Sequence, residues 1–463
     1  MSKFASDVRI YLPLKAFLAY VTLTLLLHYL GPWEYEDEKI LLPVAYMIGV
    51  MLLFALGYTS VAKRKSQNLV RSESVCAENF RRFKFVAKVG LVLQLVLTVA
   101  GAIIDAGAGR LSIISLLNPG QVYIDALNYA KAGAESSFVG QLRIIASPLI
   151  YVSNAFLLFS FYKLGRVWRF GLVGTLLLQL IIGVMTKGAQ KGIFDLFIIF
   201  ACTSFLRVYF DAKRFHRWVR TSMILLVLVL LAFTFFQLSR LAAYNISEIG
   251  VIGKMRLDSE GLIFVIFGEK MGLAVAVFIG YISQGYYGLS LCLGLPFEWT
   301  YGIGNSFALT SYAEQYLGIS QVEAATYPLR MEAAYGWPAK MLWQTFFPWV
   351  ASDITFVGAL LLMYPIGRLY ARSLTESLTY ENPLSICVFY FLTTLLLFLP
   401  ANNQLMQTRE MMVGSVVIIL SWLFLGSRFR RPRIILYSPH PATIPDHFAS
   451  PSVGDGLLKI EGK

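Results

Sequence analysis

The sequence is poor in charge. Only 14% of its 463 residues are Asp, Glu, Lys or Arg, whereas soluble domains carry about 25%. By contrast, 57% of the residues are hydrophobic and the mean hydropathy is +0.63. One core of this size cannot bury such an apolar excess. The composition therefore excludes a soluble enzyme, a secreted disulfide scaffold and a disordered protein.

Cysteine and histidine are scarce as well, with four of each. Cys76, Cys202, Cys292 and Cys387 form no CxxC pair, so we expect ordinary core residues and no disulfide or metal site. No histidine has a credible triad partner, which argues against a hydrolase with a His-activated Ser or Cys. P-loop, GxSxG and HExxH motifs are missing, and the only acidic cluster is residues 34–38.

Apolar runs of about 20 residues are abundant, and that length crosses a hydrocarbon core of about 30 Å. We predict an all-α, polytopic transmembrane helical bundle of ten spans. Twelve is the alternative, because the interrupted apolar segment 261–295 can form a hairpin, a re-entrant piece or an interfacial pair. The expected spans are residues 10–31, 40–62, 85–104, 144–162, 167–186, 191–210, 221–238, 350–369, 383–400 and 411–427. The first expected span lacks the small-residue cleavage site of a signal peptide, so we interpret it as a membrane span that is not removed.

The net charge of +13 follows from topology and not from nucleic-acid binding. With the N-terminus inside, Lys and Arg concentrate in alternate loops, so the positive-inside rule places both termini in the cytoplasm. The two main outer loops are then residues 105–143 and 239–349. We expect one membrane domain over residues 1–433 and a disordered cytoplasmic tail over 434–463.

The first candidate site is the turn 187–192, at the outer end of two predicted spans. Its glycines and the ammonium groups of Lys187 and Lys191 allow backbone N–H groups and cations to converge on an anion. Asp195 lies one helical turn after Lys191, so the two can pair and lower the cost of burying the acid. The alternative is a turn with snorkelling lysines and a structural ion pair.

The second candidate is Arg240, which follows a predicted span at the outer boundary against the positive-inside preference. An anionic ligand, a lipid phosphate or an ion pair between helices would each account for it. Tyr244 and Asn245 supply hydrogen-bond donors one turn later, so Tyr244 joins Arg240 as a candidate for binding substrate.

The third candidate is the pair Arg409 and Glu410, which precedes the last predicted span after the polar residues 402–407. Neighbouring residues point in different directions on a helix, so one can bind an anion while the other takes a proton. Glu410 suits the dipole of a first helical turn, but Arg409 does not. This mismatch favours a functional role for Arg409.

The fourth candidate is an aromatic stretch, residues 327–345, that contains Arg330 and Glu332. Clustered Trp and Tyr usually form a belt at the membrane interface, and we favour that interpretation for Trp337 and Trp343. Aromatic rings also stack on sugars, and Arg330 and Glu332 beside Trp343 can complete a carbohydrate cleft.

The arrangement resembles the O-antigen (oligosaccharide repeat unit) polymerases, the Wzy-type integral membrane glycosyltransferases. The resemblance rests on the many spans, the large outer loops and several short motifs. These are Gly-Ala-Gln-Lys at 188–191, Leu-Ser-Arg at 238–240, Thr-Arg-Glu at 408–410 and the return into the membrane over 343–359. The resemblance covers roughly residues 140–427.

The resemblance implies polymerisation of undecaprenyl-pyrophosphate-linked repeat units on the periplasmic face of the bacterial inner membrane. The growing glycan would move to the non-reducing end of a new lipid-linked unit, with no cofactor, nucleotide sugar or metal. The lipid pyrophosphate would be the leaving group, so Arg240, Arg409 and Lys191 are expected to stabilise the negative charge that develops on it. Glu410, or secondly Glu332, would be the general base. The implied partners are the lipid-linked oligosaccharide, the bilayer and a membrane protein that regulates chain length, with no nucleic acid.

Three other functions stay open. An O-antigen ligase, which moves finished polymer to lipid A, shares the general layout. A GT-C-type polyprenyl-phosphate-sugar glycosyltransferase would use the acids Glu34, Glu36, Asp37 and Glu38. A lipid-linked oligosaccharide flippase or transporter would need no catalysis and predicts charges that line a central cavity.

Overall fold

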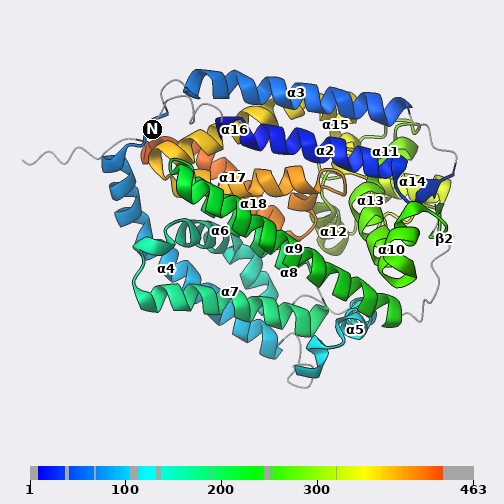
Figure 1. The fold of residues 1–463 in the computed structure, drawn as a ribbon, viewed down its shortest axis with the longest axis horizontal. Helices are drawn as coiled ribbons and strands as arrows, with labels where there is room; N and C mark the ends of the chain where they lie inside the picture. Colours follow the sequence, from blue (N-terminus) through cyan, green and yellow to red (C-terminus); the bar gives the residue numbers. More distant parts are fainter. Residues whose placement is uncertain are drawn as a thin grey trace, which may run out of the picture. The chain divides into compact units, whose positions relative to one another are not determined.

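Apolar helices make up almost all of the computed structural model (Figure 1). It describes residues 9–36, 41–66, 69–104, 113–131, 137–188, 190–243, 251–252, 254–319 and 321–430. The candidate Tyr244 and the predicted tail 434–463 lie outside the described residues.

The elements follow one another in this order: α2 Leu12–Leu30, β1 Trp33–Tyr35, α3 Leu41–Ser66, α4 Glu73–Ile104, η2 Ile113–Leu116, α5 Pro119–Lys131, α6 Phe138–Phe159, η3 Phe161–Lys163, α7 Arg166–Lys187, α8 Lys191–Val208, α9 Ala212–Ala243, β2 Val251–Ile252, β3 Met255–Leu257, α10 Leu262–Ser283, α11 Gly285–Cys292, α12 Phe307–Leu317, α13 Gln321–Ala325, α14 Tyr327–Tyr335, α15 Phe346–Leu361, α16 Met363–Tyr380, α17 Pro383–Phe398, η4 Gln404–Met406, α18 Arg409–Leu425 and η5 Gly426–Phe429.

Within the described residues, eight helices are long and apolar enough to cross a membrane. A ninth is added if α15 and α16, which are bent by 69° relative to each other, form one broken span. This confirms the predicted polytopic all-α bundle. Seven predicted spans coincide with α2, α3, α4, α6, α7, α9 and α18. The eighth apolar helix is residues 262–292, in the segment that the sequence left open.

Two predicted spans form helices that do not meet the same criteria of length and hydropathy. The helix α8 carries Lys191, Asp195 and Arg207 within its 18 residues. The helix α17 has only 16 residues, although it is strongly apolar and most of its side chains are buried. Both are packed against α6, so they belong to the bundle.

Short polar motifs set the helix ends near the candidate site. Ser137 caps α6, because its hydroxyl accepts a hydrogen bond from the Gly140 N–H at 3.1 Å. Thr408 caps α18 in the same way, through the N–H of Met411. The helix α7 ends at Gly188, whose φ of 55° is the left-handed conformation that glycine adopts readily.

A three-stranded sheet of order β1-β3-β2 joins the first loop to the segment after α9. Glu34 lies opposite Arg256 in its antiparallel register. The buried Trp33 donates its indole N–H to the Ala276 carbonyl of α10 at 2.7 Å. Of the acids that a GT-C-type enzyme would use, Glu34 is therefore part of a sheet, whereas Asp37 and Glu38 lie outside the described residues.

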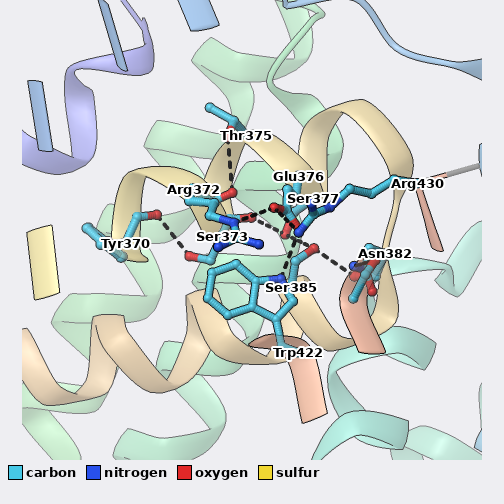
Figure 2. Close-up of polar contacts among 11 residues, drawn as sticks. Tyr370, Arg372, Ser373, Thr375, Glu376, Ser377, Asn382, Ser385, Trp422 and Arg430 are labelled. Carbon is cyan, nitrogen blue, oxygen red and sulfur yellow. Dashed lines mark hydrogen bonds and ion pairs between the residues drawn. The ribbon is translucent and has the colours of Figure 1, made fainter. Parts of the chain in front are cut away.

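The basic end of the bundle is held by two buried carboxylates, Glu376 on α16 and Glu381 immediately after α16. Glu376 accepts hydrogen bonds from Arg372 at 2.8 Å and from the Trp422 indole at 2.9 Å, and it forms an ion pair with Arg430 at 2.8 Å. These contacts are drawn in Figure 2. Glu381 pairs with Lys163 at 2.7 Å and with Arg71. Each buried acid is compensated by two cations, as a buried charge requires. These contacts join α16 to α18 and to segments before α4 and after α6.

The four cysteines are free and buried, as expected for core residues that form no disulfide. The belt interpretation of Trp337 is wrong. Its side chain is fully buried, its indole donates to the Trp343 carbonyl at 3.1 Å, and its ring packs against Tyr287. A tryptophan that is enclosed in this way stabilises the packing of α11 against the 337–343 segment.

Candidate functional site

The predicted base Glu410 faces an arginine on another helix. Arg143, in the second turn of α6, places its Nε 3.5 Å from Glu410 Oε1, and both side chains are partly exposed. The cap at Thr408 starts α18 immediately before Glu410, so the carboxylate lies in the first turn, where the helix dipole favours a negative charge. A carboxylate beside a guanidinium can accept a proton while the arginine holds an anion close to it.

A polar cavity of about 60 Å³ extends from this ion pair into the apolar bundle. Its wall comes from four helices and consists of Gln94, Leu97, Thr98, Arg143, Ser147, Ile150, Tyr151, Asn154, Gln179 and Glu410. Asn154 lies about 16 Å further along α6 than Arg143, from the helical rise per residue. The volume admits a few water molecules.

Buried amides line the inner part of this cavity. Gln94 and Asn154 are only 3% and 7% exposed, and their side-chain carbonyl oxygens accept no hydrogen bond from the described residues. Gln94 donates its N–H to Gln179 at 2.5 Å. Unpaired acceptors of this kind cost free energy unless water or another donor reaches them. The cavity is therefore built for a hydroxyl-bearing guest such as water.

Tyr151, in the wall of the cavity, lies within electrostatic range of both Glu410 and Asp195. The expected pair of Lys191 and Asp195 forms, with Nζ and Oδ2 2.5 Å apart, and the second carboxylate oxygen accepts no hydrogen bond from the described residues. Lys191 is thereby partly neutralised, whereas Lys187 is exposed at the end of α7.

Arg240 reaches the same turn from α9. Its Nη2 donates to the Gly188 carbonyl at 3.1 Å, and its guanidinium lies 3.9 Å from the centre of the Tyr123 ring. A cation over an aromatic face is stabilised by the ring electrons. The first two candidate sites thus meet, which the sequence did not indicate.

Trp343 packs against Tyr281 of α10. The two rings meet edge-on at 5.3 Å, and Tyr281 interacts electrostatically with Arg240. Arg240 therefore contacts the turn between α7 and α8, where Lys191 lies, and Trp343 packs against a tyrosine of α10 within electrostatic range of Arg240.

Arg409 points away from Glu410, as expected for neighbours on a helix. It donates to Gln315 Oε1 at 2.7 Å and lies 4.2 Å from the centre of the Tyr312 ring, both on α12. Desolvation raises the pKa of Tyr312 although Arg409 opposes the shift, so the phenol keeps its proton at neutral pH. The guanidinium is held by neutral groups and keeps its charge available for an anion.

Arg330 and Glu332 have structural partners of their own. Arg330 pairs with Glu298 at 3.0 Å and donates to the Pro296 carbonyl. Glu332 accepts the N–H of Ala339 at 3.0 Å. Both side chains fix the loops around α14, and no described contact links them to Glu410 or Arg240.

Asp353 was missed by the sequence reasoning. This buried carboxylate accepts hydrogen bonds from Thr300, Gly302, Gly304 and both N–H groups of Asn305, at 2.5 to 3.2 Å. The Asn403 side chain donates in turn to the Asn305 carbonyl at 2.9 Å. Asp353 thereby shapes the 300–305 loop that precedes α12, the helix that holds Arg409.

Comparison with protein-family models, with curated proteins and with solved structures finds no match to this chain. Among the described residues, no group of three or more His, Cys, Asp or Glu side chains is arranged to hold a metal ion. The interpretation of the site accordingly depends on its own geometry.

Proposed function

We propose that this protein is a membrane glycosyltransferase that polymerises undecaprenyl-pyrophosphate-linked oligosaccharide units, for O-antigen or a related surface polysaccharide. One observation carries the proposal. A carboxylate, Glu410, faces a guanidinium and a polar cavity, while Arg409, Lys191 and Arg240 lie at the ends of α18, α8 and α9 that the proposed topology places on the same side of the membrane. An acid that can take a proton and several cations for an anionic leaving group are what the transfer needs.

The proposed topology follows the course of the helices. Ten spans result if α8, α17 and the broken pair α15–α16 are counted and residues 262–292 enter and leave on one side. An even number places both termini together, and the basic ends make that side the cytoplasm. The sheet, α5 and α10 to α14 then belong to the periplasmic face of the inner membrane.

In the proposed reaction, Glu410 takes the proton of the acceptor hydroxyl at the non-reducing end of the new unit. The acceptor oxygen attacks the anomeric carbon of the growing glycan, and the bond from that carbon to the pyrophosphate oxygen breaks. Arg240 and Arg409 stabilise the released lipid pyrophosphate. Arg143 holds the Glu410 carboxylate in place and is a positioning residue.

The other predicted residues are assigned to substrate binding. Lys191 and Lys187 contribute positive charge near Arg240, and Trp343 offers a ring for sugar stacking. Arg330 and Glu332 support the wall of the sugar-binding region through their contacts at α14. Glu332 is not assigned as the base, because it fixes a loop next to α14 and is not among the residues that line the cavity at Glu410.

Complementation tests the proposal. In bacteria from which the endogenous polymerase gene has been deleted, the protein should restore polysaccharide with many repeats, read as a ladder on a gel. Lipopolysaccharide capped with a single repeat, despite full protein levels in the membrane, would contradict it. Polymer that accumulates on the lipid carrier but requires this chain to reach lipid A would support the ligase alternative instead.

A further inference from the structure

A second polar hollow, separate from the candidate site, opens between α3 and α16, which pack side by side (Figure 1). It has a volume of about 250 Å³ and is lined by Ser60, Val61, Arg64, Tyr364 and Arg368. The close approach of the two helices depends on Gly57, because a Cβ there would lie 2.0 Å from the Tyr364 carbonyl oxygen.

The polar groups in the hollow suit an anion. Arg64 and Arg368 contribute two guanidinium groups, Tyr364 and Ser60 contribute hydroxyls, and no carboxylate is among the lining residues. Arg368 donates to the Tyr364 hydroxyl at 3.4 Å. Elsewhere at this end of the bundle, Glu376 and Glu381 each bind two cations. Two arginines that share a hollow without an acid repel each other until an anion binds.

Two exposed apolar stripes precede the residues of the hollow in the chain, one on α3 and one on α15, the helix before α16. On α3, Leu52 and Leu56 are both 59% exposed and lie at four-residue spacing before Ser60 and Arg64. Residues four apart are neighbours on a helix surface. The α3 stripe therefore runs from leucine to a hydroxyl and then to an arginine.

The second stripe lies on α15, before the 69° bend into α16. Val357 and Leu361 are four residues apart and 66% and 57% exposed, and Tyr364 and Arg368 follow the bend on α16. Exposed apolar side chains on membrane helices face acyl chains, and cations at the ends of such helices meet phosphate groups. The two stripes together match a molecule with an anionic head and apolar tails.

We propose that the hollow binds the phosphate of an anionic membrane phospholipid, with the acyl chains along Leu52, Leu56, Val357 and Leu361. The two guanidinium groups and the Tyr364 hydroxyl donate to the phosphate oxygens. A soluble phosphate would use only the polar end and leave the apolar stripes without a role. This site is independent of the proposed transferase activity, and either proposal can fail without the other.

Lipid titration of the purified protein in nanodiscs tests the site. Phosphatidylglycerol added to a phosphatidylcholine background should raise the thermal unfolding midpoint in a saturable way. The double variant R64Q/R368Q should weaken the apparent affinity roughly 10- to 30-fold, from the electrostatic contribution of each cation near a membrane surface. The conservative variant Y364F keeps both charges and should weaken it by a smaller factor.

The matched control R166Q/R220Q removes two exposed arginines from the same end of the bundle. It should bind phosphatidylglycerol as the unaltered protein does. An equal loss in both double variants would mean general surface electrostatics and would overturn the proposal. Full protection by inorganic phosphate or glycerol phosphate alone would also overturn it, because the acyl chains would then contribute nothing. Unfolding midpoints in pure phosphatidylcholine establish that each variant is folded.

Discussion

Replacement of Glu410 by glutamine separates catalysis from stability. The change keeps the size of the side chain but removes its charge and its capacity to take a proton. At 3.5 Å the Coulomb attraction to Arg143 is roughly 5 kcal/mol for an effective dielectric constant of about 20. The two side chains are 27% and 37% exposed, so solvent screening reduces the net contribution to about 1 kcal/mol.

The expected loss of activity is much larger than this loss of stability. A general base contributes about 10²- to 10⁴-fold to a rate, which corresponds to about 3–5 kcal/mol of transition-state stabilisation. We therefore expect E410Q to remain folded and to make almost no polymer. The assay pairs polysaccharide gels with thermal unfolding, which a thiol-reactive dye reports because all four cysteines are buried and free.

Two further variants serve as controls for this prediction. R143Q breaks the same ion pair at similar cost to stability but leaves the carboxylate, so it should retain more activity than E410Q. E314Q removes an exposed acid from α12 and should behave like the unaltered protein. Normal polymer from E410Q, or a loss of polymer that merely follows a loss of folded protein, would refute the assignment of Glu410 as the base.

Three other predictions concern single residues. D353N places an NH₂ group against backbone N–H donors, so the free energy of unfolding should fall by about 2–4 kcal/mol. An unchanged unfolding midpoint in the dye assay would contradict the role of Asp353 in shaping the 300–305 loop. R240K should still make some polymer and R240Q none, because lysine keeps the positive charge although it loses the planar contacts of the guanidinium. Equal amounts of polymer from the two variants on gels would argue against a cation that stabilises an anion. G57A should destabilise the protein by about 1–3 kcal/mol, because its Cβ would overlap the Tyr364 carbonyl; an unaltered unfolding midpoint would disprove the tight packing.

Hydropathy predicts the bundle well, because the bilayer thickness sets the length of each apolar run. Local spacing also predicts the Lys191–Asp195 pair and the divergence of Arg409 from Glu410, since both follow from helix geometry. These features depend only on residues a few positions apart. The segment 261–295 was left open because its glycines interrupt the run, and Gly268 does break the helix with a φ of 71°.

The rest of the site depends on contacts between distant parts of the chain. Arg143 lies at the end of a predicted loop and shows no local sign of its pairing with Glu410. Its position at the outer end of a predicted span, against the positive-inside preference, is a signal of the same kind as for Arg240. Asp353 is the one charged residue of the run 346–361, and its five hydrogen bonds form only when the 300–305 loop folds around it.

The buried position of Trp337 has the same origin. Composition places tryptophan at a membrane interface, whereas the chain encloses this ring between Tyr287 and the Trp343 carbonyl. Sequence reasoning thus gives the helices and the residue types of a site, and tertiary packing decides which of those residues meet.

Extension of lipid-linked oligosaccharide by the purified protein is the most direct test of the central claim. The protein in nanodiscs would be given undecaprenyl-pyrophosphate-linked repeat units and no other enzyme, and the products would be sized by mass spectrometry. The account predicts products of two and more repeats with release of undecaprenyl pyrophosphate, and neither in E410Q. Folded protein that leaves every unit at a single repeat, with no released lipid pyrophosphate, would contradict it.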